Sequence, residues 1–318
     1  MSLASAICHA DSGVGCANPF DASQRSPVAF QRSPKMVDAN HNRPILVLGL
    51  MPRTGTNYLG RMLRTHRDCT TAKTLYEDFL VHSLPDLDDC VEGIATSWPK
   101  HWPCHSRLDE LRGRLGEALL AFLEDDVRSP GKRPVFKTPS VRGIDRIEHF
   151  LPQADVVIVL RQGPATIESG MRSFGWDFET ACKRWGKAVQ TVLSTAERRK
   201  AEGLKPFVLV RYEDLSTDTG RVLNSVAAQL GLDPAGFDRK RLAEFPVYGS
   251  SQQDKLNWDP VAKGSTFNPL ARAAHWPAHA IRRFDHLSGG LSAKLAYELP
   301  YSQGQGRLSA ARQRLHDA

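Results

Sequence analysis

Four short segments of this 318-residue chain combine cationic, hydroxyl and glycine residues in a way that suits an anionic ligand. The first reads MPRTGTN and covers residues 51–57, between an apolar run and a helical pattern. A loop that turns from a strand into a helix directs its N–H groups at an anion, and the helix dipole adds about half a positive charge. Gly55 permits close approach, and Arg53, Thr54 and Thr56 add side-chain donors. We predict a phosphate cradle here; the plain alternative is an ordinary turn with a surface arginine.

The second segment follows the apolar run 155–160. Arg161 comes directly after the run, and Ser169 lies eight residues further, within a helix opened by Gly163 and Pro164. A guanidinium fork and a hydroxyl at this spacing can reach one phosphate. A nucleoside triphosphatase would place an aspartate at such a strand end to hold Mg²⁺, so a cation here argues against a metal-bound triphosphate. A surface or ion-paired arginine is the alternative for Arg161.

Two further segments also follow apolar runs. Lys137 comes after residues 134–136, where it could neutralise charge on a leaving group or be a plain surface lysine. The sequence RYEDL at 211–215 comes after residues 207–210. Because ligands of open α/β sheets bind beyond the carboxyl ends of the strands, we expect all four segments to share one site.

The elements that would position these segments are buried strands alternating with helices. Continuous apolar runs predict strands at 45–50, 134–136, 155–160 and 207–210. Helical spacing follows the first loop and recurs at 178–200, at 219–230 before Gly231, and from a Ser106 cap through Leu111, Leu115, Leu119 and Phe122. We predict an α/β fold, a P-loop-like three-layer sandwich in which helices flank a central parallel β-sheet.

Composition divides the chain into three parts. Residues 1–42 are polar, repeat QRSP twice and lack periodicity, which is typical of a disordered leader. We expect the α/β domain to cover residues 43–302, with a flexible basic tail at 303–318. The weakly periodic stretch 246–277 is expected to be a mobile loop or a lid.

Charge and cysteine content narrow the function further. The net charge of +7 attracts anions, but no basic residues interleaved with aromatics indicate nucleic-acid binding. The six cysteines show no metal-ligand spacing, so we expect no metal site and reduced thiols in a cytoplasmic protein. No apolar run approaches the ~20 residues of a membrane span, and we read no secretory signal.

Taken in order and at these distances, the segments resemble the sulfotransferases that use 3′-phosphoadenosine 5′-phosphosulfate (PAPS). The matching sequences are PRTGTN at 52–57, VVIVLRQGPATIES at 156–169 and FVLVRYEDL at 207–215. The similarity spans about residues 44–260. Arginine in the loop and KTP at 137–139 are closer to the tyrosylprotein and bacterial branch than to the cytosolic aryl and steroid enzymes.

The resemblance implies a role for each matching residue. Arg53 and the loop residues Thr54, Gly55, Thr56 and Asn57 would hold the 5′-phosphate and the transferring sulfonate. Lys137 would cover the bridging oxygen, and Arg161 and Ser169 would bind the 3′-phosphate. The remaining nucleotide contacts would come from Tyr212 and from Ser250 or Ser251.

The resemblance also implies a candidate base. Aryl-type enzymes carry a histidine after the lysine–threonine pair, where this chain has Pro139. The tyrosylprotein-like branch uses a glutamate in the segment after the first helix. Glu77 lies at about the matching number of residues from Arg53. The local rivals are Asp78, His66 and His82, and the plain alternative for Glu77 is a surface residue in the first turn of a helix.

We therefore expect sulfuryl transfer from PAPS to an acceptor hydroxyl or amine by in-line displacement, with 3′,5′-ADP (PAP) as product and without metal. The acceptor would be a small molecule, a carbohydrate or a peptide, held by residues 76–85, 87–105 or 173–178. One alternative is a P-loop kinase, but the spacing from Gly49 to Gly55 is one residue too long and Thr56 stands where that motif needs lysine. The other is a nucleotide-binding module without catalysis.

Overall fold

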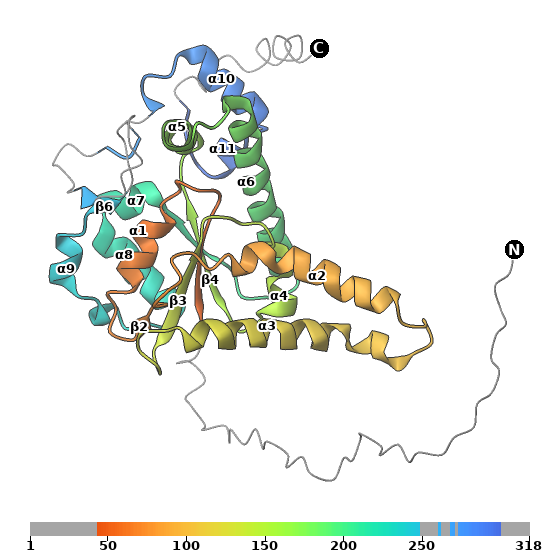
Figure 1. Cartoon of the computed structure of the whole chain (residues 1–318). Coiled ribbons are helices and arrows are strands. Elements are labelled where there is room, and N and C mark those ends of the chain that lie inside the picture. The colour runs from red at the N-terminus through yellow and green to blue at the C-terminus, as the bar shows by residue number, and fades with distance from the viewer. Residues whose placement is uncertain (1–42, 249–259, 262–267, 271–272, 300–318) are drawn as a thin grey trace, which may run out of the picture. The chain divides into compact units, whose positions relative to one another are not determined.

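Five parallel strands form the central sheet of the computed structural model, which describes residues 43–248, 260–261, 268–270 and 273–299 (Figure 1). The predicted leader and basic tail lie outside these residues. The sheet order is β2-β3-β1-β4-β5, and its strands are β1 (Ile45–Gly49), β2 (Cys69–Thr70), β3 (Arg133–Thr138), β4 (Asp155–Leu160) and β5 (Val208–Arg211). Every adjacent pair is parallel, so all carboxyl ends meet at one edge. This confirms the predicted α/β fold.

Side chains of the strands point alternately to two apolar cores, one on each face of the sheet. In β1, Leu46 and Leu48 contribute to one core, whereas Ile45 and Val47 contribute to the other. Both sets are almost wholly buried. A strand covered on both faces reads as a continuous apolar run, which is why the sequence located these strands.

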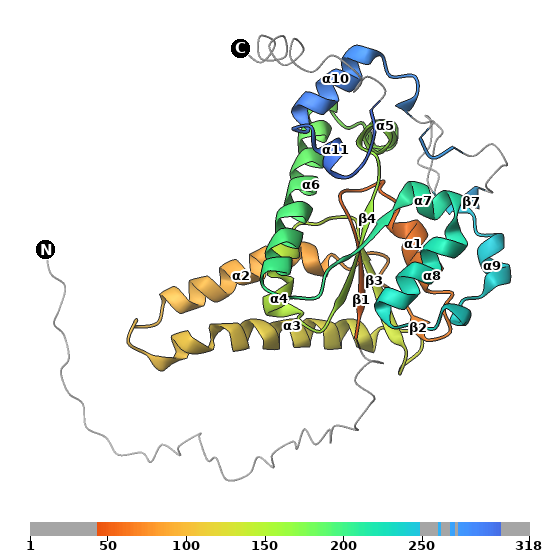
Figure 2. The ribbon, with the colours of Figure 1, turned by 180° about the vertical axis from the view of Figure 1, so that it is seen from behind.

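Helices cover both faces (Figures 1 and 2). One face carries α1 (Thr56–Leu63), α7 (Tyr212–Thr217), α8 (Thr219–Leu230) and the short α9 (Arg239–Ala243). The core of the other face is built with α2 (Leu80–Thr96), α3 (Leu108–Asp125), α4 (Ile147–Phe150), α5 (Gly163–Phe174), α6 (Phe178–Ala201), α10 (Ala278–Leu287) and α11 (Leu291–Lys294). Within the loop predicted at 246–277, β6 (Val247–Tyr248) pairs with β7 (Pro260–Val261).

The predicted helix ends are confirmed where capping residues mark them. α8 begins after Asp218, whose carboxylate accepts from the Arg221 N–H, and ends at Gly231, which has φ 68°. α6 has its N-cap at Asp177 and closes on a basic last turn. Local capping chemistry therefore sets these boundaries.

The sequence analysis missed α2, which interrupts its helical pattern with Pro85. Proline removes the N–H that would bond the Val81 carbonyl. Gly143 packs against that carbonyl: a Cβ at Gly143 would lie 2.1 Å from the Val81 oxygen, and its φ is 82°. A neighbouring loop thus accommodates the interrupted turn, and only tertiary packing reveals this.

In α3 the predicted buried face is confirmed only in part. Leu115 and Leu119 pack against the core, but Phe122 is 68% exposed, and the buried residues of the helix are Gly116, Leu120 and Leu123. Ser106 does not cap α3, because it lies in the preceding 3-10 helix at Pro103–Arg107. Spacing alone did not fix which side of this leucine-rich helix meets the core.

Candidate functional site

The loop between β1 and α1 adopts a conformation that glycine makes possible. Gly55 has φ 104° and Arg53 has φ 76°, so two residues of the loop lie in the left-handed region. A Cβ at Gly49 would lie 2.3 Å from the Thr54 hydroxyl, so the turn closes directly on the strand end. The result is a tight loop that enters the N-terminus of α1.

The loop offers backbone donors more than hydroxyls. A large cavity, described below, lies beside this loop. Thr54 does not line it: the residue is fully buried, and its hydroxyl donates to the Met51 carbonyl at 2.9 Å. Thr56 and Asn57 line the cavity. As the first residues of α1, they carry N–H groups that have no acceptor within the helix. The Thr54 hydroxyl is thus engaged within the loop, and the phosphate cradle stays a prediction that rests on the N–H groups at the start of α1.

Arg53, Arg161 and Ser169 come together beside this loop. Arg161 Nη1 donates to the Arg53 carbonyl at 2.7 Å, and Arg53 Nε donates to Ser169 Oγ at 3.0 Å. Arg161 Nε is buried and has no hydrogen-bond partner. A buried guanidinium N–H without an acceptor is costly unless a ligand supplies one, which fits an anionic group at this point.

Aromatic rings form the wall next to these cations. The Arg161 guanidinium lies over the Tyr212 ring, 4.6 Å from its centroid, and a Cβ at Gly55 would lie 2.4 Å from Tyr212 Cδ2. Tyr58 meets Tyr212 edge-on at 6.0 Å and Phe245 at 6.1 Å. Tyr58 is both buried and part of the cavity lining.

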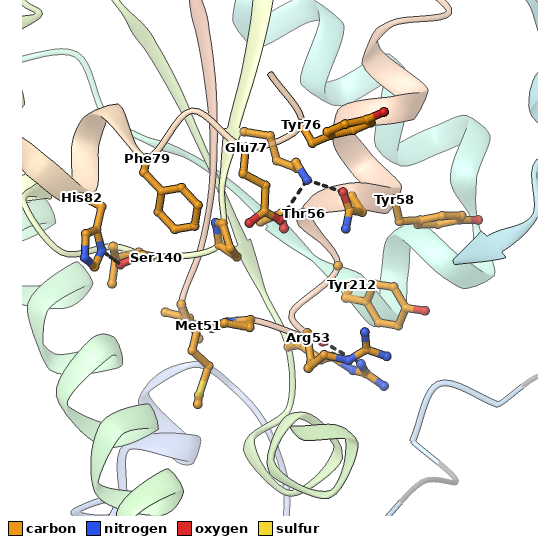
Figure 3. A pocket seen from close by; sticks show the side chains of 18 of the residues that line it. Met51, Arg53, Thr56, Tyr58, Tyr76, Glu77, Phe79, His82, Ser140 and Tyr212 are labelled. Carbon is orange, nitrogen blue, oxygen red and sulfur yellow. Dashed lines mark hydrogen bonds and ion pairs between the residues drawn. The ribbon is translucent and has the colours of Figure 1, made fainter. Parts of the chain in front are cut away.

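Glu77 and Lys137 both line the cavity and form an ion pair; Figure 3 shows where Glu77 lies. Lys137 Nζ lies 3.0 Å from Glu77 Oε1 and also donates to Asn57 Oδ1. The Lys137 side chain is 5% exposed, and its burial lowers the pKa of this ammonium. Glu77 lies in the loop that precedes α2, not in the first turn of a helix, and is 30% exposed.

The rival bases are placed differently. His66 is buried, its Nε2 lies 2.7 Å from the Asp233 carbonyl, and it does not line the cavity. Asp78 accepts from the Leu80 N–H and the Thr138 hydroxyl, and burial raises its pKa. His82 lines the cavity with Nδ1 2.9 Å from the Ser140 hydroxyl, and partial burial lowers its pKa. Of these candidates, Glu77 is the one whose carboxylate pairs with the Lys137 ammonium, whereas Asp78 meets only the Lys137 backbone, whose carbonyl accepts from the Asp78 N–H at 3.3 Å.

A cavity of about 2170 Å³ holds most of these groups. Pockets for single small ligands usually measure about 300–1,000 Å³, so this one has room for two ligands. In Figure 3, Arg53 and Tyr212 lie toward one end, His82, Phe79 and Ser140 toward the other, and Glu77 between them. Three acidic side chains line the described cavity against eleven cations: Arg53, Arg61, Arg64, Lys73, Arg128, Lys137, Arg142, Arg161, Arg184, Lys187 and Arg241.

The predicted acceptor segments divide into those that reach the cavity and one that does not. Residues 76, 77, 79, 82 and 85 line it, as does Phe174. None of residues 87–105 does, because these residues lie in α2 and beyond it. Ser250 and Ser251 lie outside the described residues. In the described ranges no three His, Cys, Asp or Glu side chains could together hold a metal, and no helix there is long and apolar enough to span a membrane.

Comparisons with known proteins match this architecture. A family model described as "Sulfotransferase family" matches residues 44–236. Protein-tyrosine sulfotransferase 2 of Gallus gallus is 22% identical over 291 residues, covering 84% of this chain and 74% of the relative.

Similar solved structures include the sulfotransferase domain of the Synechococcus PCC 7002 olefin synthase, at 21% identity and a TM-score of 0.48. The match covers 83% of this chain and 98% of that one. Mouse sulfotransferase SULT7A1, solved in complex with PAP, matches at 16% identity and a TM-score of 0.39, with 87% of this chain and 89% of that one covered.

Proposed function

Because this chain belongs to the sulfotransferase family, we propose that it transfers a sulfuryl group from PAPS to an acceptor hydroxyl or amine by in-line displacement. PAPS, when bound, supplies the activated sulfuryl group. The observation that carries the proposal is the Glu77–Lys137 ion pair in the same cavity as the Arg53–Gly55 cradle. A proton acceptor and a cation for the leaving oxygen thus face the anion site.

The donor site rests on two separate sets of groups. The loop amides, Arg53 and the N-terminus of α1 form one set, which suits the 5′-phosphate and the sulfonate. Arg161 and Ser169 form the other, which suits the 3′-phosphate. The buried, unpartnered Arg161 Nε is the feature that favours an anion there. Tyr212 and Tyr58 offer ring faces and edges beside these cations.

Lys137 would offset the negative charge that develops on the leaving phosphate oxygen. Its ammonium is nearly buried, so its charge is weakly screened by water. Asn57 and Glu77, which also line the cavity, accept hydrogen bonds from this ammonium. A cation fixed in this way needs no reorganisation during the reaction.

Glu77 would take the acceptor proton. Glu77 lines the cavity, its carboxylate pairs with Lys137, and it lies on the loop before α2; this loop and the first turn of α2 also contribute residues 76, 79 and 82 to the lining. A carboxylate that lies within hydrogen-bond reach of an acceptor hydroxyl can act as a general base, and Glu77 lines the cavity in which that hydroxyl would lie. His82 is the alternative if Glu77 proves dispensable.

We propose that no metal takes part, because Arg53, Lys137 and the loop amides supply the positive charge. The kinase alternative needs a carboxylate at the end of a strand beside β1. Instead of a carboxylate, Arg161 follows β4, and β3 ends with Lys137 and Thr138. A nucleotide-binding module without catalysis would give the Glu77–Lys137 pair no function.

We also propose a cytoplasmic location. The four described cysteines are free thiols, and burial raises the pKa of both Cys69 and Cys182 to about 12, so these two are unreactive. The acceptor class proposed from the residues alone remains a small molecule, a carbohydrate or a peptide.

The direct test is a screen of hydroxyl and amine compounds with sulfur-labelled PAPS, in buffer containing EDTA. We expect label to pass to at least one acceptor class, and we expect Glu77→Gln to lose this transfer while retaining PAP binding. Transfer that requires added Mg²⁺, or a phosphoryl group transferred from ATP, would favour the kinase alternative.

A further inference from the structure

A second group of cations lines the same cavity away from the proposed donor site. Arg61 and Arg64 come from α1 and its C-cap, while Lys73 and Arg128 come from the segments on either side of the Ala72–Val127 bridge. Arg128 Nη2 contacts the Lys73 carbonyl at 3.4 Å, which ties these two segments together. The group therefore gathers side chains from three separate stretches of sequence.

Arg64 is the unusual member of this group. It is half-buried, and within the described chain its guanidinium makes no hydrogen bond or ion pair; its Nε is wholly covered. Burial, together with the neighbouring charges of Arg61 and Arg128, lowers its pKa to about 10. A covered guanidinium N–H without an acceptor destabilises the unliganded protein.

A hydroxyl with the same unmet need lies in this part of the cavity. Thr71 also lines the cavity, and its Oγ1 is buried without a hydrogen-bond partner. Arg64 and Thr71 thus present two covered donor groups, with the exposed ammonium of Lys73 close by in sequence. All three side chains are donors that line one cavity, a set that suits an anion with several acceptor oxygens.

The position of the group relative to the proposed chemistry follows from α1. Asn57, Gly60 and Arg64 lie on one stripe of the helix, because they are three and four residues apart. Asn57 contacts Lys137, and a Cβ at Gly60 would lie 3.8 Å from Lys137 Cβ. Seven residues at ~1.5 Å each place Arg64 roughly 10 Å further along the helix from Asn57.

We propose that Arg64, Thr71, Lys73 and Arg128 bind an anionic group of the acceptor, a carboxylate, sulfate or phosphate, whose reacting hydroxyl lies at Glu77 and Lys137. This inference rests on the proposed function and adds a substrate class to it. The separation along α1 points to an acceptor whose negative charge lies roughly 10 Å from the hydroxyl. Arg53 and Arg161 belong to the donor and are not part of this subsite.

The first experiment titrates inorganic phosphate into protein saturated with PAP, by calorimetry at matched ionic strength. Saturation with PAP fills the donor site, so phosphate binding reports the second one. We expect Arg64→Met to weaken phosphate binding at least ten-fold, whereas Arg184→Met, which removes a cation of α6 that also lines the cavity, should not. Unchanged binding in Arg64→Met, or no phosphate binding by the wild type, overturns the subsite.

The melting temperature separates a ligand role from a structural one. If Arg64 is kept for a ligand, Arg64→Met should melt about 1–3 °C above the wild type without anions, because it removes an uncompensated buried charge. A merely structural arginine would lower the melting temperature when replaced. If PAP does not bind the wild type, the proposed function is contradicted instead. The subsite is then tested by titrating phosphate into the nucleotide-free wild type, Arg64→Met and Arg184→Met proteins.

A second probe tests the link to the acceptor. With PAP bound, 3-(4-hydroxyphenyl)propionate should bind at least ten-fold tighter than its methyl ester, and Arg64→Met should abolish this difference. Equal affinity for acid and ester, including no binding of either, would contradict an anionic acceptor. Phosphate binding that depends on Arg64 would in that case identify a site for a free anion.

Discussion

The paired contacts of Lys137 with Glu77 and Asn57 give each side chain a separable role in the account. Glu77→Gln keeps the shape and removes the proton acceptor, so kcat should fall about 10²–10⁴-fold with PAPS affinity nearly unchanged. Lys137→Ala should also lower kcat, since its charge matters most as the leaving oxygen becomes anionic. Steady-state kinetics with an identified acceptor measure both.

The acidity of the acceptor hydroxyl distinguishes the loss of kcat in Glu77→Gln from the loss of kcat in Lys137→Ala. With a nitrophenol, whose hydroxyl needs little help to ionise, the Glu77→Gln defect should shrink while the Lys137→Ala defect persists. Full activity of Glu77→Gln on an ordinary alcohol would move the base elsewhere, and His82 would be the next residue to replace.

Arg161 is expected to discriminate between nucleotides. Arg161→Ala should weaken PAP far more than 5′-AMP, because PAP alone carries the 3′-phosphate; a charge-assisted hydrogen bond contributes roughly 1.5–3 kcal/mol. Calorimetric titration of both nucleotides into both proteins measures the difference. Equal weakening would mean that Arg161 supports the fold of the Arg53 loop, whose carbonyl it contacts.

At the scale of elements, the packing of α3 against α4 gives a matched pair of glycines. A Cβ at Gly116 would lie 1.7 Å from the Phe150 carbonyl oxygen, whereas one at Gly113 would lie 3.9 Å from the His149 carbonyl. Alanine favours a helix over glycine by about 1 kcal/mol. Gly113→Ala should therefore raise the free energy of unfolding by about 0.5–1 kcal/mol.

Gly116→Ala should instead lower the free energy of unfolding by about 1–3 kcal/mol, because backbone must move to admit the methyl group. Urea unfolding of the two variants beside the wild type gives both values. Stabilisation by Gly116→Ala would show that α3 and α4 can separate without cost.

Elements were predictable where local chemistry sets them. Buried runs identified the four long strands, and Asp218 with Gly231 marked the ends of α8. Strand β2 has two residues and no apolar run, and Pro85 hid α2. The strand-end residues Arg53, Lys137 and Arg161 could be brought together from topology alone, because parallel strands end at one edge.

Contacts between elements that are distant in sequence could not be predicted in this way. The Glu77–Lys137 pair depends on how the loop before α2 folds over β3, and the sequence suggested Glu77 only through a family resemblance. Nothing in the sequence distinguishes Arg64, the C-cap of α1, from an ordinary polar residue. Its lack of an ion-pair partner depends on residues 71–73 and 128, which tertiary structure brings near it.

At the scale of the whole molecule, the excess of cations around the cavity should make nucleotide binding depend on salt. Raising NaCl from about 50 mM to about 500 mM should weaken PAP by about ten-fold, since screening acts on the charged ligand. Adenosine, which is uncharged, is the control and should be almost unaffected. Binding of PAP that does not respond to salt would contradict an electrostatic donor site.

The claim that this cavity is a PAPS site is tested most directly by thermal melting with PAP and with ATP plus Mg²⁺, since neither measurement requires a known acceptor. In EDTA, saturating PAP should raise the melting temperature, with a stabilisation of about 2.7 kcal/mol at one hundred times its dissociation constant. ATP with Mg²⁺ should stabilise the protein much less. Stabilisation by ATP and Mg²⁺ with no effect of PAP would contradict the account.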